Sequence, residues 1–348
     1  MSFNKFCMSS YLAFRYVAKE GIAWKDGVMP LYPLISQRKQ IGVRDAGQIL
    51  EVLRNLMGQI CKDQSVGILL SGGIDSGILA ALMPLHSRAY TIQFHAENAI
   101  DESLRARAYI ECYSLRHSIV QVTWEDYLES MDILMLNKKS PLHPVEVGLF
   151  KAASTAAADG VRTLIVGNGA DSTFGGMDKL LSRDWTFDEF DKRYTFVKPA
   201  TVLKEPVPIS SVYEEYRIDG GVDICKFLKV VHGRGIIQAF NNAISSAGCA
   251  IIEPYEYLFL DAPLDIARIR KGESKYLLRS IFQQLYPGLD VCLKIPFARP
   301  MDQWMKNWNG PSRSEFLDNL DASEFTGEQK WLIYCLERFM NLFDGKWA

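Results

Sequence analysis

A glycine turn between two apolar segments constrains the fold of this chain more than any other feature. The first segment, 66–70, is short enough for a buried strand, Ser71-Gly72-Gly73 follow it directly, and a second apolar stretch covers 78–85. The residues before it, 44–62, place apolar side chains at helical spacing. The pattern predicts a helix, a strand, a glycine turn and a further helix, with the turn at the carboxyl end of the strand.

The same alternation continues along the chain. Short apolar runs at 89–94 and 163–166 predict two more strands, and 147–158 predicts a helix between them. Strands that alternate with helices favour a parallel sheet covered on both faces, so the amino half is predicted to be a doubly wound α/β unit. Beyond about residue 178 the strand signal fades, and helical patterns dominate at 222–231, 235–246, 258–269, 275–285 and 328–343.

Charge and cysteine content exclude several classes of protein. The chain of 348 residues has 39 basic and 41 acidic side chains, so no nucleic-acid-binding surface is expected. No apolar run approaches the roughly 20 residues of a membrane span, and we expect a soluble cytoplasmic protein. The seven cysteines form no C-x-x-C pair and are interpreted as reduced thiols. Cys112 is the thiol that we retain as a candidate sulfur carrier.

The glycine turn itself predicts an anion site. Its backbone N–H groups converge where a helix dipole favours negative charge. No lysine follows as in a P-loop, and Asp75 stands beside the expected anion instead. An acidic group next to phosphate requires a cation between them. Asp75 is therefore a candidate Mg²⁺ ligand, with the Ser71 and Ser76 hydroxyls on phosphate oxygens. The alternative, an ordinary tight turn, is disfavoured by these residue types in combination.

A second glycine-rich segment, 167–171, directly follows the third predicted strand. Ligands of open α/β sheets bind beyond the carboxyl ends of the strands, so both loops are predicted to face one crevice. Asp171 and Asp75 would then hold Mg²⁺ that bridges the phosphates of ATP. The alternative role for Asp171 is to cap the following turn.

These segments carry a family resemblance. VGILLSGGIDSGILAAL and VGNGADSTFGGM resemble the synthetase domain of asparagine synthetases and β-lactam synthetases. AIDESLRARAY, GESKYLLRSIF and YLAFRYV extend the resemblance over most of residues 10–310. It implies an adenine nucleotide α-hydrolase-like fold with an extension or linker at 1–43 and an ATP pyrophosphatase core at 44–193. A helical substrate-binding part of the same domain would follow at 194–348. Its first segment, 194–217, is rich in Pro, Lys and Glu and has no clear period, so it is predicted to be a loop or lid that crosses the face of the site.

The resemblance also implies roles for individual residues. Asp75 and Asp171 would bind Mg²⁺, Lys275 would reach phosphates, and Lys294 would stabilise negative charge during acyl transfer. Lys294, Asp75 and Asp171 form the implied catalytic set. For either lysine the alternative is a solvated surface position. The implied ATP contacts, with adenine at the second strand, are Leu70, Ser71, Gly72, Gly73, Asp75, Ser76, Ile92, Phe94, Gly167 and Gly169.

The chain also departs from these families. Too few residues precede the first predicted helix for a glutaminase domain, so nitrogen is expected from free ammonia, from an amine on the substrate or from a separate glutaminase or carrier protein. Asn168 stands where asparagine synthetases have a glutamate and β-lactam synthetases a tyrosine, and an amide cannot act as the base. Glu205, Glu214 and Glu215 are candidate substitutes, although a solvated surface position is the more ordinary role for each.

The predicted function is an ATP-dependent, AMP- and pyrophosphate-forming ligase that joins a small-molecule carboxylate to an amine or ammonia. The G-G-M sequence at 175–177 is closer to the β-lactam synthetases and favours specialised metabolism. Two alternatives stay open. One is a sulfur or other nucleophile transferase on the same fold, which would need a thiol such as Cys112 near the adenylate. The other is a non-catalytic nucleotide-binding partner subunit, which the presence of both Asp75 and Asp171 disfavours.

Overall fold

The computed structural model describes residues 2–33, 39–62, 65–97, 99, 101–291 and 299–345. Its centre is a five-stranded parallel sheet in the order β4 (Arg116–Val122), β3 (Arg88–Phe94), β2 (Val66–Leu69), β5 (Thr163–Ile165) and β8 (Ala250–Ile252). The chain adds strands outward on one side of β2 and then on the other. This reversal places β2 and β5 at the switch point of the sheet, where open α/β sheets bind their ligands.

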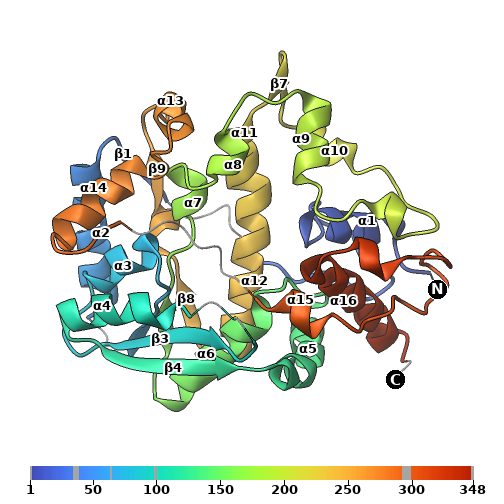
Figure 1. The fold of residues 1–348 in the computed structure, drawn as a ribbon, viewed down its shortest axis with the longest axis horizontal. Helices are drawn as coiled ribbons and strands as arrows, with labels where there is room; N and C mark the ends of the chain where they lie inside the picture. Colours follow the sequence, from blue (N-terminus) through green and yellow to red (C-terminus); the bar gives the residue numbers. More distant parts are fainter. Residues whose placement is uncertain are drawn as a thin grey trace.

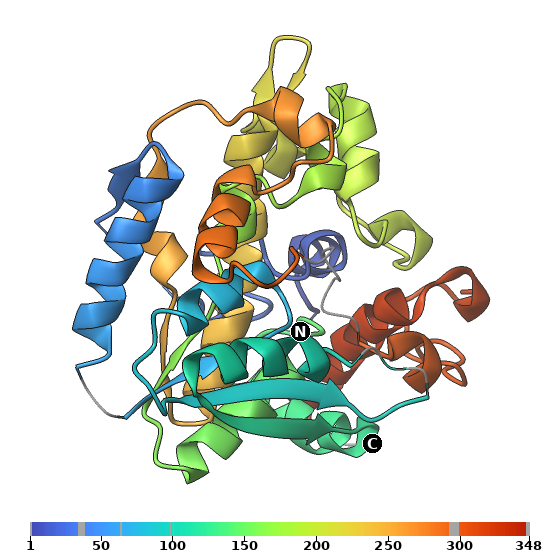
Figure 2. The ribbon, with the colours of Figure 1, turned by 60° about the vertical axis from the view of Figure 1, so that its left-hand side comes forward.

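Helices cover both faces of this sheet (Figures 1 and 2), which confirms the predicted doubly wound α/β architecture. Ile68 and Ile165 point into the core on one face, and Leu164 points into the core on the other. The first face carries α2 (Ala46–Ile60), α3 (Ile74–Ala80), α4 (Ser103–Tyr113) and α14 (Tyr276–Leu285). The second face carries α5 (Trp124–Lys138) and α6 (Glu146–Ala158).

A long helical run separates the sheet from the remaining helices. It consists of α11 (Ile224–Phe227), the π-helical turn η2 (Leu228–His232) and α12 (Gly233–Ser246). In Figure 1, α12 stands between the half that contains the five-stranded sheet and a group of helices at the right. That group contains α1 (Lys5–Phe14), α9 (Phe187–Tyr194), α10 (Ser210–Glu214), α15 (Met301–Trp304) and α16 (Gly327–Phe343).

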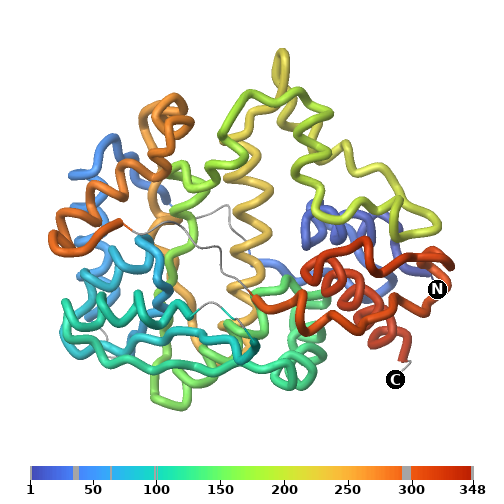
Figure 3. Tube along the Cα trace, viewed as in Figure 1, coloured from blue at the N-terminus to red at the C-terminus, as the bar shows by residue number. Residues whose placement is uncertain are grey.

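The first and last helices of the chain pack together in this group, as the trace in Figure 3 shows. Trp24 and Phe339 lie with ring centroids 4.8 Å apart, and Phe3 and Phe339 lie 6.1 Å apart. These buried aromatic contacts belong to the same core cluster as Leu164 of the sheet. The amino-terminal segment is therefore built into the body of the fold rather than attached at its edge.

Three predicted strands are confirmed as β2, β3 and β5, while β4 and β8 were not predicted. One predicted helix, 258–269, is wrong over its first half. Leu258–Leu260 form β9, which pairs in parallel with β1 (Ile41–Val43), and the helix α13 begins only at Ile266. Pro263 explains the late start, because proline disfavours the helical conformation of the residue before it. None of the described helices is long and apolar enough to cross a membrane.

The segment 194–217, predicted to be a lid, is anchored by buried side chains. Val202, Leu203 and Tyr213 are each no more than 2% exposed, and the segment contains the short helices η1 (Pro199–Thr201) and α10. Lys204 N donates to the Glu315 carbonyl at 3.0 Å, which ties the segment to the carboxyl-terminal region. In Figure 1 this part of the chain lies beside α1 and α16, on the far side of α12 from the sheet.

Candidate active site

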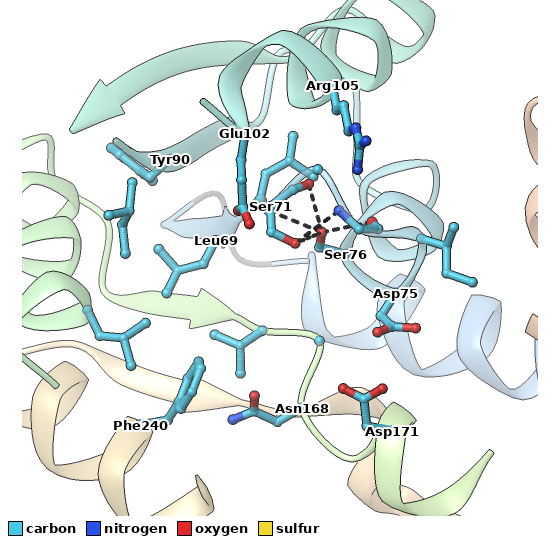
Figure 4. Close-up of a pocket in the computed structure, with 18 of the residues that line it drawn as sticks. Leu69, Ser71, Asp75, Ser76, Tyr90, Glu102, Arg105, Asn168, Asp171 and Phe240 are labelled. Atoms are coloured by element: carbon cyan, nitrogen blue, oxygen red, sulfur yellow. Dashed lines mark hydrogen bonds between the residues drawn. The ribbon is translucent and has the colours of Figure 1, made fainter. Parts of the chain in front are cut away.

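The loop between β2 and α3 is closed by the Ser76 hydroxyl. This oxygen accepts a hydrogen bond from Ser71 N at 3.1 Å and lies 3.0 Å from Ser71 Oγ, while Gly73 N donates to Ser71 Oγ at 3.2 Å (Figure 4). Ser76 is buried in the first turn of α3. Gly72 is needed because α4 packs close by: a Cβ there would lie 2.8 Å from Arg105 Cβ. The two serines therefore fix the conformation of this loop.

The loop after β5 supplies the second half of the site. Asp171 lies in the short helix α7 (Ala170–Thr173), and its carbonyl accepts a hydrogen bond from Gly176 N at 2.9 Å. A Cβ on Gly176 would lie 1.9 Å from Asp171 Oδ1 and 2.2 Å from Lys275 Cε. Only glycine fits between these two side chains. The G-G pair after Asp171 therefore lets a lysine from a distant helix enter the site.

Lys275 lies between the two predicted metal ligands. Its Nζ contacts Asp75 Oδ2 and lies 2.7 Å from Asp171 Oδ1, and its side chain is only 7% exposed. Burial alone lowers the pKa of the Lys275 ammonium, but the two carboxylates outweigh it and the net pKa is raised. The lysine is therefore a fixed positive charge at this point. Its backbone is left-handed, with φ 54°, where it begins α14.

The donor set fits a magnesium ion. Asp75 and Asp171 face one another from α3 and α7, the helices that follow the neighbouring strands β2 and β5 (Figure 4). They already hold a cationic group between them, the Lys275 ammonium. Carboxylate oxygens are the donors that Mg²⁺ prefers, and the ion usually keeps water and phosphate as further ligands. Among the described residues no cluster of three or more His, Cys, Asp or Glu could hold a metal alone. Two carboxylates would thus bind the ion together with phosphate oxygens.

The two loops open onto one cavity of about 280 Å³. One wall is apolar and suits a purine ring, and the other consists of the glycine loop and three cations. The cations are Arg105, Lys275 and Arg279. The apolar wall consists of Leu69, Tyr90, Ile92, Leu149, Val166 and Phe240. A cavity with one apolar and one cationic wall matches a nucleoside phosphate in chemistry.

Glu102 adds a titratable carboxyl group to this cavity (Figure 4). Burial raises its pKa to about 7, against a smaller lowering effect from the neighbouring Arg105 guanidinium and from a hydrogen bond with Gly72 N. The other carboxyl groups among the described lining residues are Asp75, Asp101 and Asp171. Glu102 is therefore a lining carboxyl group whose charge changes near neutral pH.

The structure places most of the predicted nucleotide-binding residues around the cavity. Phe94 and Gly169 are not in its lining: Phe94 packs against Trp304, and Gly169 forms a positive-φ turn beside Glu256. Lys294 lies outside the described residues. The predicted residues that do line the cavity are Leu70, Ser71, Gly72, Gly73, Asp75, Ser76, Ile92, Gly167, Asp171 and Lys275.

The candidate substitutes for the missing base lie elsewhere. Glu205 pairs with Lys5 at 3.0 Å, and Glu214 pairs with Arg217 at 2.7 Å, both at exposed positions. Asn168 does line the cavity, and its amide donates to Glu253 Oε1 at 3.1 Å. Sequence reasoning missed Glu253, which is 1% exposed at the end of β8, because β8 itself was not predicted.

Sequence reasoning also missed Arg105, Arg279 and Phe240 as lining residues. Arg279 follows Lys275 by one helical turn and carries the arginine of the K-x-x-L-R pattern, so this pattern was a usable signal. Phe240 lies on α12 and meets the cavity only through tertiary packing. Cys112, the candidate sulfur carrier, is an exposed free thiol on α4 that does not line the described cavity.

Residues 48–217, which contain both loops, match the family model described as asparagine synthase. Amidase chry2 of Gibberella zeae is 26% identical over 197 residues, covering 51% of this chain and 28% of that protein. Amidase chyE of Penicillium rubens is 28% identical over 134 residues, covering 33% of this chain and 20% of that protein. The chain thus spans less than a third of the length of these curated relatives.

A solved structure of an NH3-dependent NAD synthetase from Campylobacter jejuni is also similar. It is 20% identical, and the match covers 38% of this chain and 60% of that chain with a TM-score of 0.27.

Proposed function

We propose that this chain is an AMP-forming amide ligase, because residues 48–217 match the asparagine synthase family model, which describes an ATP-utilising synthetase domain. In the first half-reaction a substrate carboxylate oxygen attacks the α-phosphorus of ATP, and the bond to pyrophosphate breaks. In the second, an amine or ammonia attacks the acyl carbon, AMP leaves with the carboxylate oxygen, and one proton is released. The product is an amide, and the sequence features that resemble β-lactam synthetases favour a specialised metabolite.

The observation that carries this proposal is the convergence of Asp75, Asp171 and Lys275 beside the Ser71–Ser76 loop. Pyrophosphate is the most highly charged group in the reaction, and the glycine loop lines the same cavity as three cations. Fixed donors and cations stabilise charge on a departing group without reorganising in the transition state. A Mg²⁺ ion bound by Asp75 and Asp171 would supply further positive charge at the phosphates.

The individual roles follow from position. Ser71, Gly72 and Gly73 would bind pyrophosphate oxygens, and Ile92, Leu149 and Phe240 would enclose the adenine ring. Lys275 would move from the two aspartates to phosphate oxygens when the nucleotide enters. Lys294 keeps its proposed part in acyl transfer on the strength of the family resemblance alone.

The proposal is tested by exchange of labelled pyrophosphate into ATP with pooled carboxylic acids. At least one pool is expected to support exchange by the wild-type chain. Asp75→Asn should reduce that exchange about 100-fold or more, since the metal loses an anionic ligand. Asp178→Asn is the matched control, because Asp178 is exposed in the first turn of α8 (Asp178–Leu181), outside the cavity. Full exchange by Asp75→Asn would contradict the metal assignment.

A further inference from the structure

A second partly buried cation lies away from the nucleotide cavity. Arg15 follows α1 in a left-handed conformation, with φ 68°, and its guanidinium carbon lies 4.3 Å from the centre of the Phe196 ring. Its remaining side-chain contact is with His143, whose Nε2 lies 3.4 Å from Arg15 Nη1. No described carboxylate forms an ion pair with Arg15, although burial lowers the pKa of this guanidinium. The Glu328 carboxylate, which pairs with Arg299, favours the charged form of Arg15 from nearby, so within the described part of the chain Arg15 has no carboxylate partner of its own.

Neighbouring cations do not share this property. The Arg299 guanidinium lies 2.6 Å from Glu328 Oε1, and the buried Lys138 ammonium lies 2.5 Å from Glu146 Oε1. Both are thereby matched to a carboxylate. Burying a charge is costly unless it is paired, so an unmatched arginine in this setting favours binding of an anion.

The hydrogen bonding of His143 points to the same missing group. Its two ring nitrogens face two donors: Val145 N–H at 3.3 Å from Nδ1, and the Arg15 guanidinium at Nε2. A neutral imidazole accepts at one nitrogen and donates from the other, so one of these contacts sets a donor against a donor. His143 is 3% exposed, and burial, followed by the charge of Arg15, lowers its pKa well below the usual value. Protonation cannot resolve the conflict, because it adds a further donor.

We propose that Arg15 and His143 form a subsite for a carboxylate group of the substrate, distinct from the carboxylate that is adenylated. One carboxylate oxygen would lie beside the pair, within hydrogen-bond distance of both Arg15 Nη1 and His143 Nε2, and would accept from both. A single negative charge matches the positive charge of Arg15, and a planar carboxylate matches the planar donor pair of a guanidinium. This proposal rests on the proposed function, because it names the substrate class of that ligase as an acid or amine with a further carboxylate.

The subsite lies within reach of the nucleotide cavity. His143 precedes Leu149, a cavity-lining residue, by six positions. Even a fully extended chain of that length spans only about 20 Å. The neighbouring Tyr16 donates from its hydroxyl to the Val231 carbonyl at 2.9 Å and packs on Gly235 of α12, the helix that also places Phe240 at the cavity. The span from His143 to Leu149 bounds the length of a substrate that would contact both the subsite and the cavity.

The test measures binding of succinate without ATP, so that it does not depend on turnover. Titration of ¹³C-labelled succinate, followed by NMR, should show saturable binding to the wild-type chain. Arg15→Met should weaken this binding at least tenfold, and Arg15→Lys should recover only part of it, because lysine keeps the charge but not the paired donors. Lys198→Met is the matched control. It removes an exposed cation two residues from Phe196 and should leave succinate binding unchanged.

Two results would overturn the subsite: no saturable succinate binding by the wild-type chain, or equal affinity in the wild type and Arg15→Met. Circular dichroism checks that each variant is folded, and Arg15→Lys serves as the decisive variant if Arg15→Met is not. ATP affinity is measured in parallel and should stay within twofold of the wild type in Arg15→Met. Loss of succinate binding with ATP binding retained separates this subsite from the nucleotide site, and the pyrophosphate exchange assay tests the proposed function independently.

Discussion

Two partly buried cations on opposite sides of α12 differ in their partners. The Lys275 ammonium is held by two carboxylates, Asp75 and Asp171. The Arg15 guanidinium instead contacts the Phe196 ring and the His143 imidazole. The first arrangement is complete without a ligand, so under the proposed function a nucleotide and its metal would exchange partners with the lysine. The second lacks a carboxylate of its own among the described residues. The comparison suggests two modes of binding. A ligand of the Lys275 site would displace the lysine from its two carboxylates, whereas a ligand of the Arg15 site would itself supply the carboxylate that pairs with the arginine.

The largest expected effect is at the site where Lys275 pairs with Asp75 and Asp171. Asp171→Asn should reduce ATP–pyrophosphate exchange about 100- to 1,000-fold, because the amide is a weaker metal ligand and no longer neutralises Lys275. Arg15→Met should leave exchange intact with any acid that has no second carboxylate. Equal losses in the two variants would mean that both cations serve the same step, and the comparison between them would fail. Steady-state exchange rates with one monocarboxylic acid measure both effects.

The next effect is on stability. Lys275→Met should lower the free energy of unfolding of the ligand-free chain by about 3 kcal/mol, because two carboxylates are left facing each other in a nearly buried site. Urea denaturation measures this change. Adding Asp171→Asn to the variant should restore part of the loss, since it removes one of the like charges. Lys198→Met, at an exposed position, should cost less than about 0.5 kcal/mol. A Lys275→Met chain as stable as the wild type would show that Lys275 does not offset the charges of Asp75 and Asp171.

The same architecture could be predicted from sequence only in part. The loops at Ser71 and Asp171 were found because glycines after a short apolar run specify a turn at a strand end through local chemistry. The strand β4 was missed because it is an edge strand that mixes polar and apolar residues, and β8 because three residues carry too little pattern. Leu258–Leu260 were assigned to a helix, since their pairing with Ile41–Val43 is a long-range contact.

The partners of the two cations were equally inaccessible from sequence. Lys275 and Asp75 are 200 positions apart, and Arg15 and His143 are 128 positions apart. The motif indicated that Lys275 lies near phosphates, but its contact with both aspartates depends on the packing of α14 against α3. Arg15 belongs to a stretch that the sequence marked only as a linker, and its unmatched charge is visible only once its neighbours are placed.

A smaller effect should appear with pH. The Glu102 carboxyl has a pKa of about 7 in the folded chain and about 4.5 when unfolded, so between these values the folded state binds more protons. Its contribution to stability therefore falls as pH rises through this window. Glu102→Gln should remove this fall. The free energy of unfolding of the variant, relative to that of the wild type, should therefore be about 1 to 2 kcal/mol higher at pH 8 than at pH 4.5, after allowance for partial exposure. Parallel stability curves for the two chains from pH 4.5 to 8 would contradict the assignment.

The smallest expected effect is at Cys112. Cys112→Ala should change exchange and amide formation less than twofold, because this exposed thiol does not line the nucleotide cavity. Adenylation that persists while product formation is lost in this variant would favour a sulfur-transfer reaction instead.

The most direct test of an AMP-forming ligase follows oxygen atoms. An acid that supports exchange is labelled with ¹⁸O in its carboxylate and turned over with ATP and hydroxylamine as the amine, and the phosphorus products are analysed by mass spectrometry. Attack on the α-phosphorus predicts AMP that carries one ¹⁸O atom, together with unlabelled pyrophosphate. Labelled inorganic phosphate together with ADP would place the attack on the γ-phosphorus and would contradict the account.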